Sequence, residues 1–121
     1  MNIEQLYQYC LNKKGVTEDF PFDEDTLVFK VLGKMFLLVS LKSWESGNAT
    51  INLKADPDYS QELRVEYESI QPGFHMNKKH WNTVNIHKGE LSQKLILELI
   101  DHSYDMVVKS MPKKLKDILR K

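Results

Sequence analysis

The chain has a single cysteine, Cys10, among its 121 residues. It cannot form an internal disulfide framework, so the cysteine content gives no support to an oxidising compartment. The longest strongly apolar stretch, Met35 to Leu41, is interrupted by Ser40 and is far shorter than the ~20 apolar residues of a membrane span. The first residues lack the basic segment and apolar run of a secretory signal. We therefore expect a cytoplasmic protein that has no membrane partner.

The motifs of nucleotide and metal chemistry are absent as well. Neither GxxxxGK[ST] nor GxGxxG occurs, so the sequence gives no reason to expect a bound nucleotide. His75, His80 and His87 are five and seven residues apart, which matches no dense pattern of metal ligands. The acidic residues between positions 18 and 25 lack the alternating ligands and central glycine of a calcium loop. We expect no cofactor, and no stoichiometric zinc or iron in the purified protein.

Asp101-His102-Ser103 contains the residue types of a hydrolase triad. Consecutive residues of a helix point about 100° apart, so these three side chains cannot form the chain of hydrogen bonds that such catalysis needs. We expect His102 and Ser103 to line the inner face of a helix, with Ser103 bonded back to a helix carbonyl. The sequence therefore predicts no catalytic residues and a protein that is not an enzyme.

Hydrophobic periodicity and turn residues predict one domain, residues 1–121, with an α+β fold. An antiparallel sheet with the terminal helices packed on one face is the economical arrangement. A tight turn at Gly33-Lys34 is expected to join the first two strands, since glycine supplies a positive φ. Residues 16–26 and 70–81 are expected to be irregular connections. The predicted helices cover residues 3–14, 57–67, 91–109 and a short segment after Pro112, and the predicted strands cover residues 27–32, 35–41, 49–53 and 82–86.

Charge is balanced overall but not along the chain. Residues 1–70 hold 12 acidic and 7 basic residues, a net charge of −5, whereas residues 71–121 hold 5 acidic and 10 basic residues, a net charge of +5. Such a chain can carry a basic surface that its neutral total hides, unless the two halves interleave in space and their fields cancel.

Two basic segments lie in the second half. Lys78-Lys79 is flanked by Phe74-His75 and by His80-Trp81, and this mixture of cations and rings is typical of nucleic-acid surfaces. The second segment, residues 109–121, carries Lys113 and Lys114. The alternative is that these lysines only keep the protein soluble. We expect Trp81 to be a core residue at the start of a strand, with both flanking lysines outside.

Several segments together resemble the MmcQ/YjbR family. The resemblance covers essentially the whole chain, and its main element is a Pro-Gly turn, a basic stretch and then His-Trp entering a strand. It implies a two-layer sandwich like that of the frataxin homologue CyaY, a role in DNA binding and no catalytic residues. The first helix offers one acid, Glu4, so the iron chemistry of frataxins is not carried over. The segments that carry the resemblance are residues 71–84 (QPGFHMNKKHWNTV), 33–36 (GKMF), 53–57 (LKADP), and Ser103-Tyr104 followed by Val107-Val108.

Three hypotheses of function follow from these features. The first is a non-enzymatic protein that binds double-stranded DNA by electrostatic, weakly sequence-specific contacts. The second is a small cytoplasmic interaction or adaptor module that does not bind nucleic acid and uses the acidic residues 18–25. The third, an enzyme whose site is assembled from scattered residues, would need a concave pocket with perturbed ionisable groups. The expected DNA contacts of the first are Lys78, Lys79, His75, Lys113 and Lys114.

Overall fold

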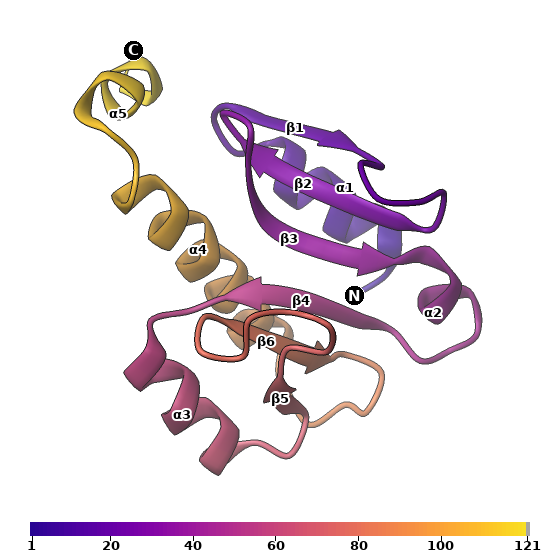
Figure 1. The fold of residues 1–121 in the computed structure, drawn as a ribbon. Helices are drawn as coiled ribbons and strands as arrows, with labels where there is room; N and C mark the ends of the chain where they lie inside the picture. The colour runs from indigo at the N-terminus through magenta and orange to yellow at the C-terminus, as the bar shows by residue number, and fades with distance from the viewer. Residues whose placement is uncertain (121) are drawn as a thin grey trace.

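The computed structural model describes residues 1–120, which form an α+β fold around one antiparallel sheet of six strands (Figure 1). The strands lie in the order β1-β2-β3-β4-β6-β5. No helix in this part of the chain is both long and apolar enough to cross a membrane. The elements are α1 (Ile3–Leu11), β1 (Val16–Asp19), β2 (Thr26–Val31), β3 (Lys34–Ser40), α2 (Leu41–Glu45), β4 (Thr50–Lys54), α3 (Pro57–Glu66), β5 (Ile70–Pro72), β6 (Trp81–Asn85), α4 (Gln93–Lys109) and α5 (Lys113–Leu119).

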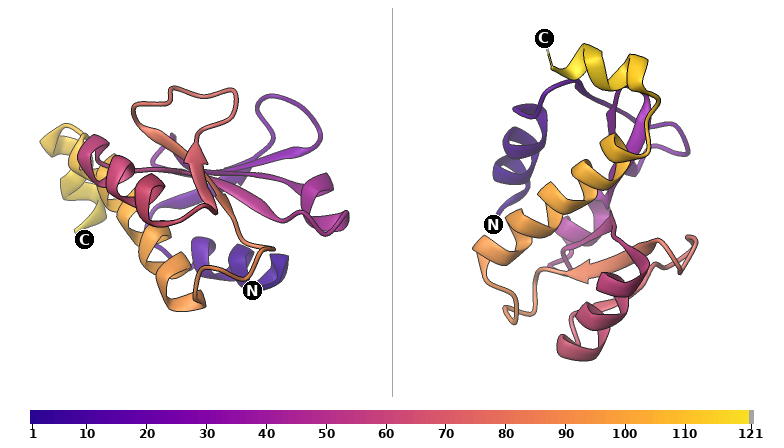
Figure 2. Two further views of the ribbon diagram at one scale, coloured as in Figure 1. Left: turned by 90° about the horizontal axis from the view of Figure 1, so that it is seen from below. Right: turned by 90° about the vertical axis from the view of Figure 1, so that its left-hand side faces the viewer.

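The two faces of the sheet differ. Helices α1 and α4 cover one face, whereas the β1–β2 loop (residues 20–25) and the β5–β6 loop (residues 73–80) project from the other, which we call the open face (Figure 2). Helix α3 packs beside β5 at the edge of the sheet (Figure 1). The main core lies between the sheet and the two covering helices, as predicted. It includes Leu6, Cys10, Phe29, Phe36, Leu37, Ile51, Val84, Leu99 and Ile100.

Local sequence signals place the starts of α1 and α3 correctly, whereas α4 begins at Gln93, two residues later than predicted. The Asn2 side chain accepts a hydrogen bond from the Gln5 backbone at 2.8 Å, and the Gln5 side chain accepts one from the Asn2 backbone at 2.9 Å, which is a complete capping box. Asp56 caps α3, with Pro57 as its first residue. Helix α1 ends at Leu11, three residues earlier than predicted.

The first hairpin forms as predicted, but its turn lies one residue earlier. Strands β2 and β3 pair antiparallel, and the pair Val31↔Lys34 leaves Leu32-Gly33 as the two-residue loop. Both loop residues have positive φ, 48° and 83°. A two-residue turn that matches the right-handed twist of the strands needs this conformation at both positions. Gly33 relieves the strain at only one of them.

The structure contains three short elements that the sequence analysis missed, because none shows a clear apolar period. Residues 16–26 are not an irregular connection throughout, since β1 pairs with β2 from Val16↔Val31 to Asp19↔Val28. Strand β5 pairs with β6 within the segment that was expected to be irregular. Both are edge strands of only three or four residues. Pro72 is tolerated in β5 because one side of an edge strand's backbone needs no ladder partner. Helix α2 has five residues.

A hydroxyl group from α4 joins the two halves of the sheet. Strands β3 and β4 pair at only two positions, Leu37↔Leu53 and Leu38↔Asn52. On the other side of β3, a bulge in the β2–β3 ladder leaves Phe36 without a paired residue. The Ser103 hydroxyl donates to the Phe36 carbonyl at 2.5 Å and accepts from the Lys54 amide at 2.9 Å. The prediction that Ser103 bonds back to its own helix was therefore wrong. A buried hydroxyl satisfies both strands where their direct pairing stops.

Trp81 is buried at the first residue of β6, as predicted, but on the open face. It is 8% exposed and forms a small cluster with Val28 and Leu38, against which Met35 and Met76 pack. This cluster is separate from the main core. Lys78 and Lys79 lie outside it and are exposed.

Replacing the bridging hydroxyl tests its role in the sheet. We expect Ser103→Ala to lower the free energy of unfolding by about 1–3 kcal/mol, because it leaves buried backbone groups without a partner. Urea denaturation measures this. Ser46→Ala removes an exposed hydroxyl that bonds only to the preceding helical turn, and it should change stability by less than about 0.5 kcal/mol. Equal stabilities of the two variants would contradict the bridging role.

Trp81→Ala should lower the free energy of unfolding by about 3–5 kcal/mol, the range for losing a large buried aromatic side chain. Val65→Ala, at a side chain that is 90% exposed, is the matched surface control. Thermal and urea unfolding give the comparison. If the Trp81 variant melted like the wild type, the small cluster on the open face would not contribute to stability.

Candidate functional site

A groove of about 600 Å³ lies on the open face, between the β1–β2 loop and the β5–β6 loop. Its volume falls within the range of ligand pockets, about 300–1,000 Å³. Apolar and aromatic side chains make up much of its wall, and the polar groups are concentrated on its floor. Its lining residues are Phe22, Asp23, Thr26, Met35, Leu38, Val39, Ser40, Thr50, Asn52, Phe74, His75, Met76 and Thr83.

From each bounding loop, one exposed phenylalanine lines the groove. Phe22 in the β1–β2 loop is 63% exposed, and Phe74 in the β5–β6 loop is 70% exposed. The His75 ring leans against Phe74 with 4.1 Å between ring centroids. Large apolar side chains this exposed at both rims of one groove are informative, because they add nothing to the core.

The floor of the groove offers hydrogen-bonding groups. Thr83 Oγ1 donates to Asn52 Oδ1 at 2.6 Å and accepts from the Phe74 amide at 3.0 Å. This chain of bonds fixes the base of the β5–β6 loop to the sheet. It also leaves the amide nitrogen of Asn52, on the groove floor, with no partner within residues 1–120.

The β5–β6 loop has a tightly constrained backbone. A Cβ atom at Gly73 would lie 2.9 Å from the Cβ of Trp81 and 3.0 Å from its carbonyl oxygen, so only glycine fits there. His75 has a φ of 61°, a left-handed conformation that is uncommon for a residue with a side chain. Backbone strain of this kind persists where the surroundings impose it, and it is concentrated at functional sites.

Arg64 of α3 holds this loop in place, a role that the sequence analysis missed. Its Nε donates to Asn82 Oδ1 at 2.7 Å, and its Nη2 donates to the carbonyls of Lys78 and, at 3.2 Å, Trp81. The planar fork of a guanidinium suits such divided contacts. The available signal was an arginine on a helix otherwise rich in acids, but its target is 14 to 18 residues away in sequence.

The expected DNA contacts do not all meet. His75, Lys78 and Lys79 share the β5–β6 loop, whereas Lys113 and Lys114 lie on α5, which extends away from that loop at the far end of α4 (Figures 1 and 2). The Lys78 ammonium group donates to the Gly73 carbonyl at 3.0 Å, so it also stabilises the loop. The Lys79 ammonium group has no partner in the part of the chain that the structure describes.

Two acids of the segment 18–25, Asp23 and Asp25, form hydrogen bonds within the fold. Asp23 accepts hydrogen bonds from the backbone amides of Thr26 and Asp25, at 2.6 and 2.9 Å, and these bonds hold the pKa of Asp23 below its usual value. Asp25 accepts from the Ser40 hydroxyl at 2.6 Å and from the Lys42 amide at 2.8 Å. The acids that were expected to bind a partner protein are therefore partly engaged in shaping the β1–β2 loop.

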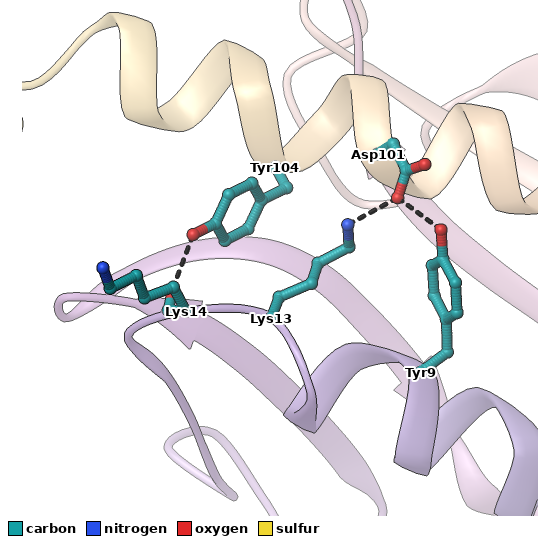
Figure 3. A network of polar contacts seen from close by, with 5 residues as sticks. All are labelled: Tyr9, Lys13, Lys14, Asp101 and Tyr104. Atoms are coloured by element: carbon teal, nitrogen blue, oxygen red, sulfur yellow. Dashed lines mark hydrogen bonds and ion pairs between the residues drawn. The ribbon is translucent and has the colours of Figure 1, made fainter. Parts of the chain in front are cut away.

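Asp101 joins α4 to α1 in the network of Figure 3. Its Oδ1 accepts from the Tyr9 hydroxyl at 2.6 Å and pairs with the Lys13 ammonium group at 2.5 Å. The Lys13 nitrogen also lies 5.0 Å and 5.1 Å from the ring centroids of Tyr9 and Tyr104. The Tyr104 hydroxyl donates to the Lys14 carbonyl at 2.6 Å. These contacts fix the covering layer as a unit.

His102 faces a different element from its neighbour Asp101. Its Nε2 accepts a hydrogen bond from the Asp56 amide at 3.2 Å, next to the N-terminus of α3. Burial is the main cause that lowers the pKa of His102, so the imidazole is neutral around pH 7. Asp101, His102 and Ser103 thus bond to three separate parts of the fold, and they do not form a triad.

Cys10 lies in the main core, as predicted, and is fully buried. Burial raises the pKa of its thiol to about 12, so the reactive thiolate is scarce. Across residues 1–120, no three His, Cys, Asp or Glu side chains are grouped so that they could hold a metal ion.

The chain belongs to the YjbR family, whose profile matches residues 11–106. It is 33% identical over 119 residues to the uncharacterized protein YjbR of Escherichia coli K12, and the aligned region covers 98% of each chain. It is 42% identical over 96 residues to the uncharacterized protein YbdF of Escherichia coli O157:H7, or 78% of this chain and 75% of YbdF. The crystal structure of a Deinococcus radiodurans protein with a DUF419 domain has a TM-score of 0.87 at 37% identity, covering 98% of this chain and 87% of that one.

Arg64→Lys tests how the β5–β6 loop is held. Lysine cannot make the same divided contacts, so we expect the free energy of unfolding to fall by about 1.5–3 kcal/mol, the range for hydrogen bonds to a charged group. Amide hydrogen exchange should speed up in residues 74–80. Arg120→Lys alters an exposed pair with Asp117 and should change neither quantity. Unchanged exchange in the loop would contradict the role of Arg64.

Proposed function

We propose that this protein is a non-enzymatic nucleic-acid-binding module whose DNA contacts are made by the β5–β6 loop and the adjacent open face. One observation carries the proposal: exposed lysines share a projecting, braced loop with an exposed aromatic side chain at the rim of a groove. Lysine side chains neutralise phosphates and release counterions, which favours binding without sequence readout. The resemblance to a family expected to bind DNA supports the same reading.

Sequence preference should be slight. Readout of duplex bases needs a helix or ribbon of donor and acceptor side chains that enters the major groove. The long helix α4 and helix α1 lie on the covered face, where their apolar sides pack on the sheet (Figure 2). The side chains nearest the open face are therefore those of loops and strands, and they suit contacts to the nucleic-acid backbone.

The proposal of a non-enzymatic role is supported by the way the ionisable groups are used. Asp101 and His102 hold α4 against its neighbours, and Asp23 shapes its own loop. Among residues 1–120, His75 is the one histidine that lines the groove, and no acid or nucleophile there is hydrogen-bonded to its ring. General acid–base catalysis needs such partners to orient and tune the group.

A protein-interaction module is the second candidate, favoured by the exposed rings of Phe20, Phe22 and Phe74. Contiguous apolar surface marks interaction sites for proteins as well as for nucleic acids. The two candidates differ in their response to salt. Phosphate contacts weaken steeply as salt rises, whereas apolar docking of a peptide does not.

The test is fluorescence anisotropy of labelled DNA at several salt concentrations. If Lys78 and Lys79 each neutralise a phosphate, log K against log salt should have a slope of about −1.8 on duplex DNA, or about 12-fold weaker binding between 50 and 200 mM salt. Lys78→Glu with Lys79→Glu should abolish most of this slope. Lys113→Glu with Lys114→Glu makes the same change of charge on α5 and should leave binding nearly unchanged.

Other results would overturn the proposal or relocate the site. Absence of binding at about 50 mM salt with tens of micromolar protein would reject a nucleic-acid role. Equal losses in the two charge-reversal variants, with a slope near −3.6, would mean that about four phosphates are contacted. Helix α5 would then belong to the interface, and the assignment to one loop would be wrong.

A further inference from the structure

The two rims of the groove present phenylalanine rings that are mostly exposed, although the His75 ring lies 4.1 Å from that of Phe74. Phe22 and Phe74 come from loops on either side of the groove, and both are mostly exposed. The apolar side chains of the sheet already have partners in the main core or in the Trp81 cluster. Exposed aromatic side chains beside lysines are the features with which proteins bind unpaired bases, because every base has a face that can stack.

The floor between the two rings offers groups that suit the edge of a base. The Asn52 amide nitrogen has two hydrogens and no partner within residues 1–120. The Thr50 hydroxyl, also on the lining, can both donate and accept. Together these groups can bond to the carbonyl oxygens and ring nitrogens of several bases, so they favour binding with little discrimination.

The two loops beside the groove carry charges of opposite sign. Lys78 and Lys79 belong to the β5–β6 loop, whereas the lining acid Asp23 belongs to the opposite loop. Asp23 is held as a carboxylate by two backbone amides. A phosphate backbone is attracted to the first loop and repelled by the second, so a bound strand would run along the β5–β6 side with its bases turned inward.

We propose that the groove binds the bases of single-stranded nucleic acid, with Phe22 and Phe74 as stacking faces and the phosphates on Lys78 and Lys79. This inference rests on the proposed function and names its ligand more closely. A duplex is a poorer occupant, because its base faces are already stacked on one another and cannot reach either phenylalanine. Single strands expose both the faces and the edges that the groove can contact.

The experiment compares a labelled single strand of about ten nucleotides with the duplex of the same sequence, in one buffer. We expect tighter binding of the single strand. Phe22→Ala and Phe74→Ala should each weaken it by about 5- to 150-fold, the range for losing one stacked base, and should leave duplex binding unchanged. Phe74→Trp should retain binding, since tryptophan keeps a stacking face.

Phe20→Ala is the matched control. Phe20 lies in the same loop as Phe22 and is 46% exposed, but it does not line the groove. The Phe20→Ala variant should bind the single strand as tightly as the wild type. The thermal midpoints of all these variants should agree, because the replaced rings are exposed, so losses of binding would not reflect unfolding.

The outcomes separate the two proposals. One outcome is that duplex binds as tightly as the single strand, that the phenylalanine variants bind like the wild type, and that the Lys78/Lys79 variant binds more weakly. This outcome would overturn the stacking groove and keep the nucleic-acid role. Equal effects of the phenylalanine variants on both ligands would also overturn strand selectivity. Binding of neither ligand at about 50 mM salt would remove the proposed function, and the groove assignment with it.

Discussion

One buried hydroxyl holds the halves of this sheet together. Between β3 and β4 the ladder has only two residue pairs, and the Ser103 hydroxyl bonds to one backbone group on each strand. The two preceding residues of α4 reach other elements: Asp101 pairs with α1, and His102 accepts a bond beside the start of α3. Since consecutive helical residues point about 100° apart, one turn of α4 can fix three directions at once. Asp101, His102 and Ser103, which have the residue types of a catalytic triad, therefore connect α4 to the rest of the fold.

Helices α1 and α4 bury the apolar side chains of the covered face. The open face carries no helix, and polar contacts determine the shape of the loops that project from it. Arg64 braces the β5–β6 loop from the side of α3, Gly73 allows its close approach to Trp81, and Asp23 closes the opposite loop. These contacts position two exposed rings across a groove whose floor is part of the rigid sheet. Loops held in this way are preorganised, which would lower the entropic cost of binding at the proposed site.

The fold determines where the acidic and basic residues of the two halves of the chain lie. The excess of acids in the first half of the chain is partly consumed by capping and pairing, as at Asp19 with Lys30 and Asp25 with Ser40. The bases of the second half do not form one group, since some lie in the β5–β6 loop and others on α4 and α5. Membership of the YjbR family places these features in a common fold, whereas the proposal of a nucleic-acid ligand rests on the surfaces themselves. The likeness to the CyaY sandwich stays a prediction.

The sequence by itself determined the local structure. The Asn2–Gln5 capping box, the Asp56-Pro57 helix start and the glycine of the first hairpin act over a few residues, and periodicity identified the long helices and inner strands. Edge strands β1 and β5 were missed because an edge strand of three or four residues is defined by its neighbour and is too short to show an apolar period of its own. Tertiary structure alone decided the target of Arg64, the bridging role of Ser103 and the separation of Lys113 from Lys79. It also decided the groove, whose lining comes from two loops and four strands. Contacts between segments far apart in sequence are set by packing, which no local pattern encodes.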